Sequence, residues 1–291
     1  MSSQDHLQWA SLFRDNQSAW DSRVDVHAQS RFYDVEGFLA GKSSLTPMEQ
    51  RLLGDVNGKS LLHLQCHFGL DTLSWARQGA RVVGVDFSGK AVTLARRLTE
   101  ESGLSERAQF VECNVYDTRA HVAETFDIVF SSFGVVGWLP DLRPWAQVIR
   151  ESLRPGGRFV LVEFHPYVWM SQVGPDLSIR YPYFNRGAIS EEGSGTYAER
   201  SAKLSYREHG WNHPLADVMS ALLDEGLRLE QFAEYDYSPF DIFPGMVRRD
   251  NSVPPRLPLA AKRGESDEGF WFQECPGMIP LTYSLQVTRG D

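Results

Sequence analysis

The chain has few cysteines, and none of them has the spacing of a metal or redox motif. Cys66, Cys113 and Cys275 are the only three in 291 residues, and no CxxC pair occurs. A disulfide framework and a structural zinc site are therefore disfavoured. Sparse cysteine also fits a reducing compartment, so we expect a cytoplasmic protein.

Long apolar runs and long basic runs are absent as well. No apolar stretch approaches the roughly 20 residues that a transmembrane helix needs, and the polar first residues contain no hydrophobic signal core. The net charge is −9 and the pI about 5.4, so the basic face that phosphate contacts require is missing. We expect a soluble monomer or homodimer with no membrane and no nucleic-acid partner.

What the chain does have is enough apolar residues for a full core, at 42% hydrophobic and 12% aromatic. From residue 59 to about 165, strand patterns alternate with amphipathic helix patterns, which predicts a parallel sheet with helices on both faces. A further helix ending at Gly226 and two more strands follow. The strands are expected at 60–66, 81–87, 109–113, 126–132, 158–164, after Gly226 and at 281–289, and helices at 70–77, from Ser88 onward and at 145–157.

Three regions lie outside this alternation. Residues 1–58 have the spacing of a helical prelude. The stretches at about 166–212 and 236–280 are rich in glycine, proline and aromatic residues, and we expect them to be irregular insertions in a domain that spans 59–291. Loops of that length are unusual unless they are functional.

The turn after the first strand lacks most of the glycines of a dinucleotide site. Gln65 and His67 occupy the first two glycine positions of the GxGxxG pattern, and only Gly69 remains. Side chains there crowd a pyrophosphate, which disfavours NAD, NADP and FAD. No GxxxxGK[ST] phosphate loop occurs either.

A ligand with a ribose and no phosphate is less demanding of this turn. Asp86 ends the second strand, where an acid accepts hydrogen bonds from ribose hydroxyls. An adenosine with an amino-acid tail fits, with the tail carboxylate against the N–H groups of the turn and the following helix N-terminus. His67 can add a donor.

Five segments in this order resemble the class I S-adenosylmethionine-dependent methyltransferases over about residues 45–165. They are "LLHLQCHFGLDTLSWA", "GVDFS", "FVECNVYD", "FDIVFSSFGVVGWL" and "LRPGGRFVLVEF". The resemblance implies a Rossmann-like α/β fold with a mostly parallel seven-stranded sheet, an N-terminal lid at 1–58 and S-adenosyl-L-methionine as cofactor. His63 stands where the family usually has an acid. The implied cofactor-binding residues are Gln65, Cys66, His67, Gly69, Asp86, Phe87, Asn114, Val115 and Ser131.

Candidates for catalysis lie after the fifth strand and in the prelude. His165 follows the strand at the functional edge of the sheet and has a side chain suited to a general base, although a structural loop histidine is the alternative. Tyr33 can reach the methionine carboxylate. Asp34 can face the sulfonium or a cationic acceptor, although an ordinary helix-end aspartate is equally compatible with the pattern.

Aromatic residues after the fourth and fifth strands are candidates for the acceptor pocket. Phe133, Trp138 and Trp169 can form its walls, or they can belong to the core. His209 and His213 have HxxxH spacing, but a glycine and a proline interrupt the helix that metal binding would need, so we expect no metal.

We therefore expect methyl transfer from S-adenosylmethionine to a small molecule, such as a secondary metabolite. The altered turn leaves a second hypothesis open, in which an enzyme of this fold performs elimination or ring closure without methyl transfer. A third hypothesis is a non-catalytic ligand-binding or scaffolding protein.

Overall fold

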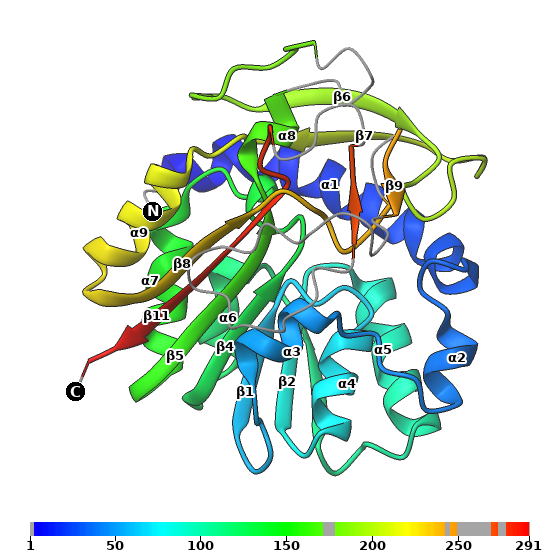
Figure 1. Ribbon diagram of the computed structural model, residues 1–291, viewed down its shortest axis with the longest axis vertical. Coiled ribbons are helices and arrows are strands. Elements are labelled where there is room, and N and C mark those ends of the chain that lie inside the picture. The colour runs from blue at the N-terminus through cyan, green and yellow to red at the C-terminus, as the bar shows by residue number, and fades with distance from the viewer. Residues whose placement is uncertain (1–2, 171–177, 242–244, 249–268, 273–277, 291) are drawn as a thin grey trace.

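A computed structural model describes residues 3–170, 178–241, 245–248, 269–272 and 278–290. A seven-stranded sheet in the order β3-β2-β1-β4-β5-β11-β8 forms its centre (Figure 1). The first five strands are parallel, and β11 is antiparallel to β5 and β8. The predicted mostly parallel α/β sheet is confirmed. Its strands are β1 Ser60–Leu64, β2 Arg81–Asp86, β3 Ala108–Glu112, β4 Phe126–Ser132, β5 Leu153–Phe164, β8 Leu227–Tyr235 and β11 Thr282–Arg289.

Helices cover both faces of the sheet. One face carries α3, α4 and α5, and the other carries α6, α7 and α9. Within the described residues, no helix combines the length and the apolar character that crossing a membrane requires. The helices are α1 Ser3–Gln29, α2 Val35–Leu39, α3 Pro47–Leu53, α4 Leu70–Arg77, α5 Gly89–Glu101, η1 Val115–Asp117, α6 Thr118–His121, η2 Val136–Trp138, α7 Leu142–Ser152, α8 Pro166–Met170 and α9 Leu215–Asp224.

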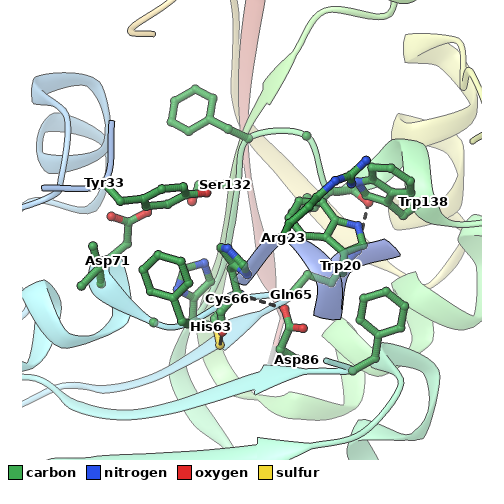
Figure 2. Close-up of a pocket in the computed structure, with 18 of the residues that line it drawn as sticks. Trp20, Arg23, Tyr33, His63, Gln65, Cys66, Asp71, Asp86, Ser132 and Trp138 are labelled. Atoms are coloured by element: carbon green, nitrogen blue, oxygen red, sulfur yellow. Dashed lines mark hydrogen bonds between the residues drawn. The ribbon is translucent and has the colours of Figure 1, made fainter. Parts of the chain in front are cut away.

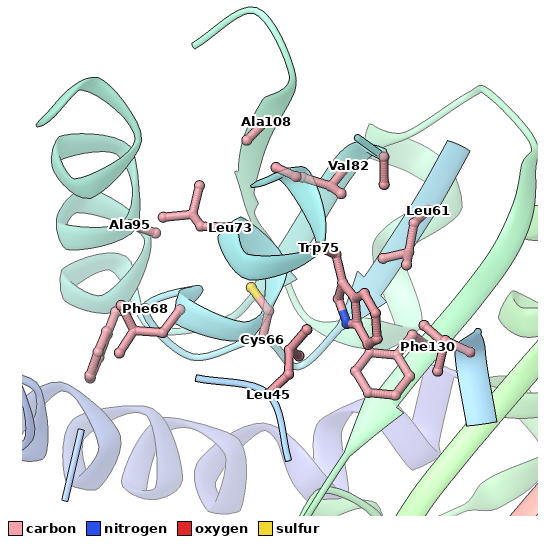
Figure 3. Close-up of a cluster of buried hydrophobic side chains, with 14 of the residues drawn as sticks. Leu45, Leu61, Cys66, Phe68, Leu73, Trp75, Val82, Ala95, Ala108 and Phe130 are labelled. Atoms are coloured by element: carbon pink, nitrogen blue, oxygen red, sulfur yellow. The ribbon is translucent and has the colours of Figure 1, made fainter. Parts of the chain in front are cut away.

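The central strands are continuous apolar runs because both of their faces are buried. Leu61 and Leu62 are neighbours in β1, and both are 0% exposed. Leu61 joins a cluster with Trp75 and Phe130 under α4 (Figure 3), whereas Leu62 joins the cluster around Trp145 of α7. Successive side chains of a strand point to opposite faces, so each needs its own apolar layer.

Local signals set where the helices begin and end. Ser88 caps α5 as predicted, since its hydroxyl accepts a hydrogen bond from the Ala91 N–H at 3.1 Å. The helix α7 ends at Ser152, before the Pro-Gly-Gly turn at which we expected it to close. The chain has already joined the sheet there, because Leu153 pairs with Phe126 of β4.

The N-terminal residues serve two purposes. The long helix α1 crosses the carboxyl edge of the sheet beneath a β-hairpin (Figure 1). Asn16 of α1 ties it to that hairpin: its amide nitrogen donates to the His209 carbonyl at 2.9 Å, and its oxygen accepts from the His209 N–H at 2.8 Å. In contrast, Met48 and Leu53 of α3 belong to the core under the sheet.

The two long insertions are only partly as expected. The stretch 166–212 contains α8 and an antiparallel hairpin of β6, Ile189–Ser194, and β7, Ser205–Gly210, so the prediction of an irregular loop was wrong there. In 236–280, β9, Val247–Arg248, pairs with β10, Phe270–Trp271. Cys275 lies outside the described residues.

Candidate functional site

A cavity of about 550 Å³ opens at the carboxyl ends of the central strands. This volume lies within the range of about 300–1,000 Å³ that is typical of small-molecule sites. Its sheet side is formed by the turns that follow β1, β2, β3 and β4, and its lid side by α1 and the β6–β7 hairpin. Ligands of open α/β sheets bind at this edge.

The turn after β1 keeps the backbone of a glycine turn although two of its glycine positions hold Gln65 and His67. Gln65, His67 and Gly69 have φ values of 58°, 52° and 78°, all in the left-handed region. The Cys66 N–H donates to the Val85 carbonyl at 3.0 Å, which holds the turn against β2. Left-handed conformations are unfavourable for Gln and His, and such strain concentrates at functional sites.

The side chains of Gln65 and His67, which replace two glycines, connect this turn to its surroundings. The Gln65 amide nitrogen donates to the Val135 carbonyl at 2.9 Å, and its buried oxygen has no partner. His67 Nε2 lies 3.0 Å from His27 Nδ1 of the lid, and His67 Nδ1 is buried without a partner. Burial, the other imidazole and nearby Arg23 hold the pKa of His67 well below its usual value, so the ring is neutral.

Asp86 lies at the end of β2 and lines the cavity (Figure 2). One of its oxygens accepts from the His67 N–H at 2.8 Å and the other from the Ser88 N–H at 2.9 Å. Burial raises the pKa of Asp86 to about 6 against the effect of these bonds, so the group is mainly ionised at neutral pH. A carboxylate has about four lone-pair sites, so Asp86 keeps acceptor capacity for a ligand hydroxyl.

Phe87, Asn114 and Val115 line the cavity beside Asp86. Asn114 caps η1 with its side-chain oxygen, which accepts from the Tyr116 N–H at 3.1 Å. This leaves the amide NH₂ of Asn114 as a donor. Phe13 of α1 lines the same end of the cavity and packs edge-on against the Tyr116 ring at 6.0 Å.

The end of the turn that leads into α4 lies near two carboxylates, those of Asp71 and Glu49. In β1, where the related family usually has an acid, this chain has His63. His63 is 2% exposed, shares a hydrogen bond with Thr72 Oγ1 at 2.8 Å and is kept neutral by burial, which lowers its pKa to about 3. Asp71 of α4 lines the cavity and accepts from Ser44 Oγ at 2.5 Å. Burial raises the pKa of Asp71 to about 6, and burial together with Asp71 raises that of Glu49 to about 8, so the two hold one proton at neutral pH.

Sequence reasoning missed Asp71. The available signal was an acid two residues after Gly69, in the first turn of a helix. The helix dipole alone favours a carboxylate at that position, so its presence does not by itself indicate a functional site.

The loop after β4 is held by a carboxylate that the sequence did not single out. Glu163 of β5 is 3% exposed and accepts hydrogen bonds from the N–H groups of Gly134, Val135 (2.7 Å), Val136 (2.9 Å) and Phe164 (2.6 Å). This loop presents Phe133 and Trp138, and α8 presents Trp169, the aromatic side chains expected to form the acceptor pocket. Phe133, Trp138 and Trp169 all line the cavity.

The prelude residues Tyr33 and Asp34 also line the cavity, in different ways. The Tyr33 hydroxyl shares a hydrogen bond of 2.5 Å with that of Tyr197, and burial holds the pKa of Tyr33 well above its usual value. Asp34 caps α2 by accepting from the Gly37 N–H at 3.1 Å, and it pairs with the exposed Lys42 at 2.7 Å. Tyr33 therefore faces the cavity as a neutral phenol, and Asp34 is an exposed rim residue with a capping role.

The structure does not bring His165 to the cavity. Its Nε2 bonds to Glu234 Oε1 of β8 at 2.9 Å, and its Nδ1 accepts from the Tyr167 N–H at 3.1 Å. It is not among the residues that line the cavity, so the placement expected of a general base is not found. Ser131 is 0% exposed and points away from the cavity, whereas Ser132 lines it, because successive residues of β4 face opposite ways.

The lid supplies site residues that no sequence pattern identified. Trp20 and Arg23 come from α1, and Tyr197, Tyr206 and Glu208 from the hairpin. Their sequence separation is too large for a local pattern to associate them.

Residues 62–161 match the family model described as "Methyltransferase domain". The chain is 28% identical over 158 residues to a ubiquinone biosynthesis O-methyltransferase of Cronobacter sakazakii, a match covering 52% of this chain and 64% of that protein. It is 27% identical over 99 residues to the tRNA 5-carboxymethoxyuridine methyltransferase of Escherichia coli K12, covering 34% and 38%. The chain thus spans less than two thirds of each of these relatives.

Solved structures with the same fold cover more of the chain. An S-adenosylmethionine-dependent methyltransferase from Mesorhizobium loti aligns over 86% of this chain and 100% of its own, with a TM-score of 0.56 and 19% identity. The glycopeptide N-methyltransferase MtfA, complexed with S-adenosylmethionine, aligns over 84% and 86%, with a TM-score of 0.52 and 12% identity. At these identities the likeness concerns the fold.

Proposed function

Because this chain belongs to the class I S-adenosylmethionine-dependent methyltransferases through its domain at residues 62–161, we propose that it transfers the methyl group of S-adenosylmethionine to a small-molecule acceptor. The observation that carries the proposal is the pairing of Asp86 with the left-handed turn 65–69 on one cavity.

The residues of the cavity fit the cofactor part by part. Asp86 has free lone pairs for the ribose hydroxyls, and Asn114 has a free amide NH₂ beside Phe87 for the adenine. Asp71 supplies the negative charge that an α-ammonium group requires. The orphaned Gln65 oxygen and His67 Nδ1 are further polar atoms without a protein partner.

When bound, S-adenosylmethionine supplies an electrophilic methyl group on a positively charged sulfur. The protein then has to align an acceptor with that group and exclude water. Such alignment can remove a large part of the activation barrier. The α1 helix and the hairpin cover the cavity for this purpose, and the aromatic rings of Phe133 and Trp138 form its walls. The Tyr33 hydroxyl is a neutral hydrogen-bonding group at the amino-acid end.

A small acceptor fits better than a macromolecule. The cavity lies under the α1 lid, which is closed by the Asn16 pair to His209. Aromatic walls suit a planar or apolar compound. A net charge of −9 disfavours a polyanionic acceptor.

Calorimetric titration with S-adenosylmethionine and S-adenosylhomocysteine tests the first half of the proposal. We expect micromolar binding, weakened by about 1–3 kcal/mol in Asp86→Ala because charge-assisted hydrogen bonds are lost. Asp224→Asn, which changes an exposed carboxylate at the end of α9, is the matched control and should bind normally. Absence of binding at millimolar ligand would overturn the proposal.

Release of S-adenosylhomocysteine, measured by mass spectrometry against a panel of small acceptors, tests the second half. Binding without any release across the panel would favour the hypothesis of an enzyme that performs elimination or ring closure.

A further inference from the structure

Arg23 is a buried cation on the lid side of the cavity. It lies on α1, outside the matched domain, and is 4% exposed. Its guanidinium carbon lies 4.0 Å from the centre of the Tyr206 ring and 5.0 Å from that of Trp20. Its Nη2 forms an ion pair with Glu208 of β7. Burial alone would lower the pKa of Arg23, but Glu208 and Tyr206 raise it overall, so the group stays charged.

The guanidinium is not fully satisfied by these neighbours. Its Nε is buried and has no hydrogen-bond partner. A guanidinium has five N–H donors in a planar fork that matches a carboxylate. Buried donors without an acceptor are uncommon in folded proteins, and because Arg23 also lines the cavity, a bound ligand is a candidate to supply the acceptor.

Arg23 is distinct among the charged groups around the cavity. Of the described residues that line it, Arg23 and Lys42 are the two with cationic side chains, and Lys42 is exposed and paired with Asp34. Figure 2 shows Arg23 beside Trp20 and Trp138, away from Asp71. Arg23 thus lies among aromatic rings, and the carboxylate of its partner Glu208 lines the same side of the cavity.

We propose that Arg23 is the residue that selects the acceptor, and that this acceptor is an aromatic carboxylic acid whose carboxylate pairs with the Arg23 guanidinium. This inference rests on the proposed methyl transfer. The rings of Trp20, Tyr206 and Trp138 receive the planar part of the acceptor, and the ion pair with Glu208 orients Arg23.

The methionine tail of the cofactor also has a carboxylate, so either the cofactor or the acceptor could supply the carboxylate that pairs with Arg23. With the ribose at Asp86 and the ammonium at Asp71, the tail lies along the turn, and Figure 2 shows Asp71 apart from Arg23. Its two charged groups are attached to one carbon and must lie together. Arg23 is therefore assigned to the acceptor, and the cofactor carboxylate becomes an outcome of the test.

The experiment compares benzoate, indole-3-carboxylate and quinoline-2-carboxylate with their primary carboxamides. Binding is measured by ligand-observed NMR on the protein alone and on the protein saturated with S-adenosylhomocysteine. We expect the wild-type protein to prefer acids over amides about tenfold or more, the ratio that one charge-assisted pair gives. Arg23→Gln should abolish the preference, and Arg23→Lys should retain part of it because the charge remains without the planar fork.

Glu208→Gln is the opposing variant. It leaves Arg23 in place and removes its counter-charge, so acids should bind more tightly than to the wild type while amides are unaffected. This increase keeps the proposal testable even if Arg23→Gln does not fold.

Three results would overturn the inference: equal binding of acids and amides, no binding of any acid at millimolar concentration, or a loss of S-adenosylhomocysteine affinity in Arg23→Gln with the acid preference intact. The last result would assign Arg23 to the cofactor. A wild-type protein that binds acids but not S-adenosylhomocysteine would instead contradict the proposed methyl transfer.

Discussion

The two sides of the cavity are built in different ways. On the sheet side, buried carboxylates hold the backbone: Asp86 accepts two backbone N–H bonds and Glu163 accepts four. On the lid side, side chains hold distant elements together, as in the pairs of Asn16 with His209 and of Asp21 with Ser88.

This difference indicates separate roles in stability and in ligand exchange. Removing a sheet-side group leaves several buried N–H groups without acceptors, which affects the whole fold. Removing a lid contact breaks one or two bonds between elements, and we expect the sheet to stay folded when they are lost. If the proposed cofactor binds under α1 and the hairpin, we expect its release to require movement of these elements.

Glu163→Ala should have the largest effect. Four N–H groups lose their acceptor, and each one that remains buried without a partner costs about 1–3 kcal/mol. Water that enters the site can bind some of these groups, so we expect the free energy of unfolding to fall by about 3–5 kcal/mol. Urea denaturation measures this change. Glu100→Ala, which removes an exposed carboxylate of α5, is the control. A loss below about 1 kcal/mol in Glu163→Ala would remove the distinction between the two sides.

His63 should make the sheet side sensitive to acid. Burial lowers its folded pKa from 6.5 to about 3, so the unfolded chain binds the proton more readily and stability is lost as pH falls from 6.5 towards 3. His63→Asn keeps a hydrogen-bonding group that does not titrate. Between pH 7 and pH 5, the wild type should lose about 2 kcal/mol of unfolding free energy relative to this variant. Parallel pH profiles would contradict a buried neutral His63.

Asp71→Asn should weaken binding of S-adenosylhomocysteine by about 1.5 kcal/mol, because a carboxylate that pairs with the ammonium is lost. The wild-type affinity should also decrease below pH 6, since burial raises the pKa of both Asp71 and Asp86 to about 6, and the part of the decrease that Asp71→Asn lacks belongs to Asp71. Calorimetry at pH 5 and pH 7.5 measures both effects. Equal affinities for the two proteins at both pH values would place the ammonium elsewhere.

Asp21→Ala should have the smallest effect on stability and a visible effect on release. It removes the acceptor of the Ser88 hydroxyl, a bond of 2.5 Å between α1 and α5. We expect S-adenosylhomocysteine affinity to fall by about 0.5–1 kcal/mol, mainly through faster dissociation, with unfolding unchanged within about 0.5 kcal/mol. Stopped-flow fluorescence of Trp20 and Trp138 reports the dissociation rate. An unfolding effect larger than the release effect would show that the lid is part of the core.

Much of the sheet side could be predicted from sequence. Asp86 and the turn 65–69 follow directly from strand patterns, because the carboxyl end of a parallel strand fixes the position of the next residue. The direction in which a side chain points was harder to predict from the sequence. His165 follows the correct strand but turns to Glu234 of β8, and only the packed sheet brings β8 alongside.

The amino-acid sequence by itself determined the alternating α/β order, the atypical turn and the acid at the end of β2, since each is encoded within a few consecutive residues. Only the tertiary structure decided that Arg23 meets Glu208, that His27 meets His67 and that Asp71 is the acid near the turn. These encounters join segments far apart in the chain, and they depend on how helices and a hairpin pack over the sheet, which no local pattern specifies.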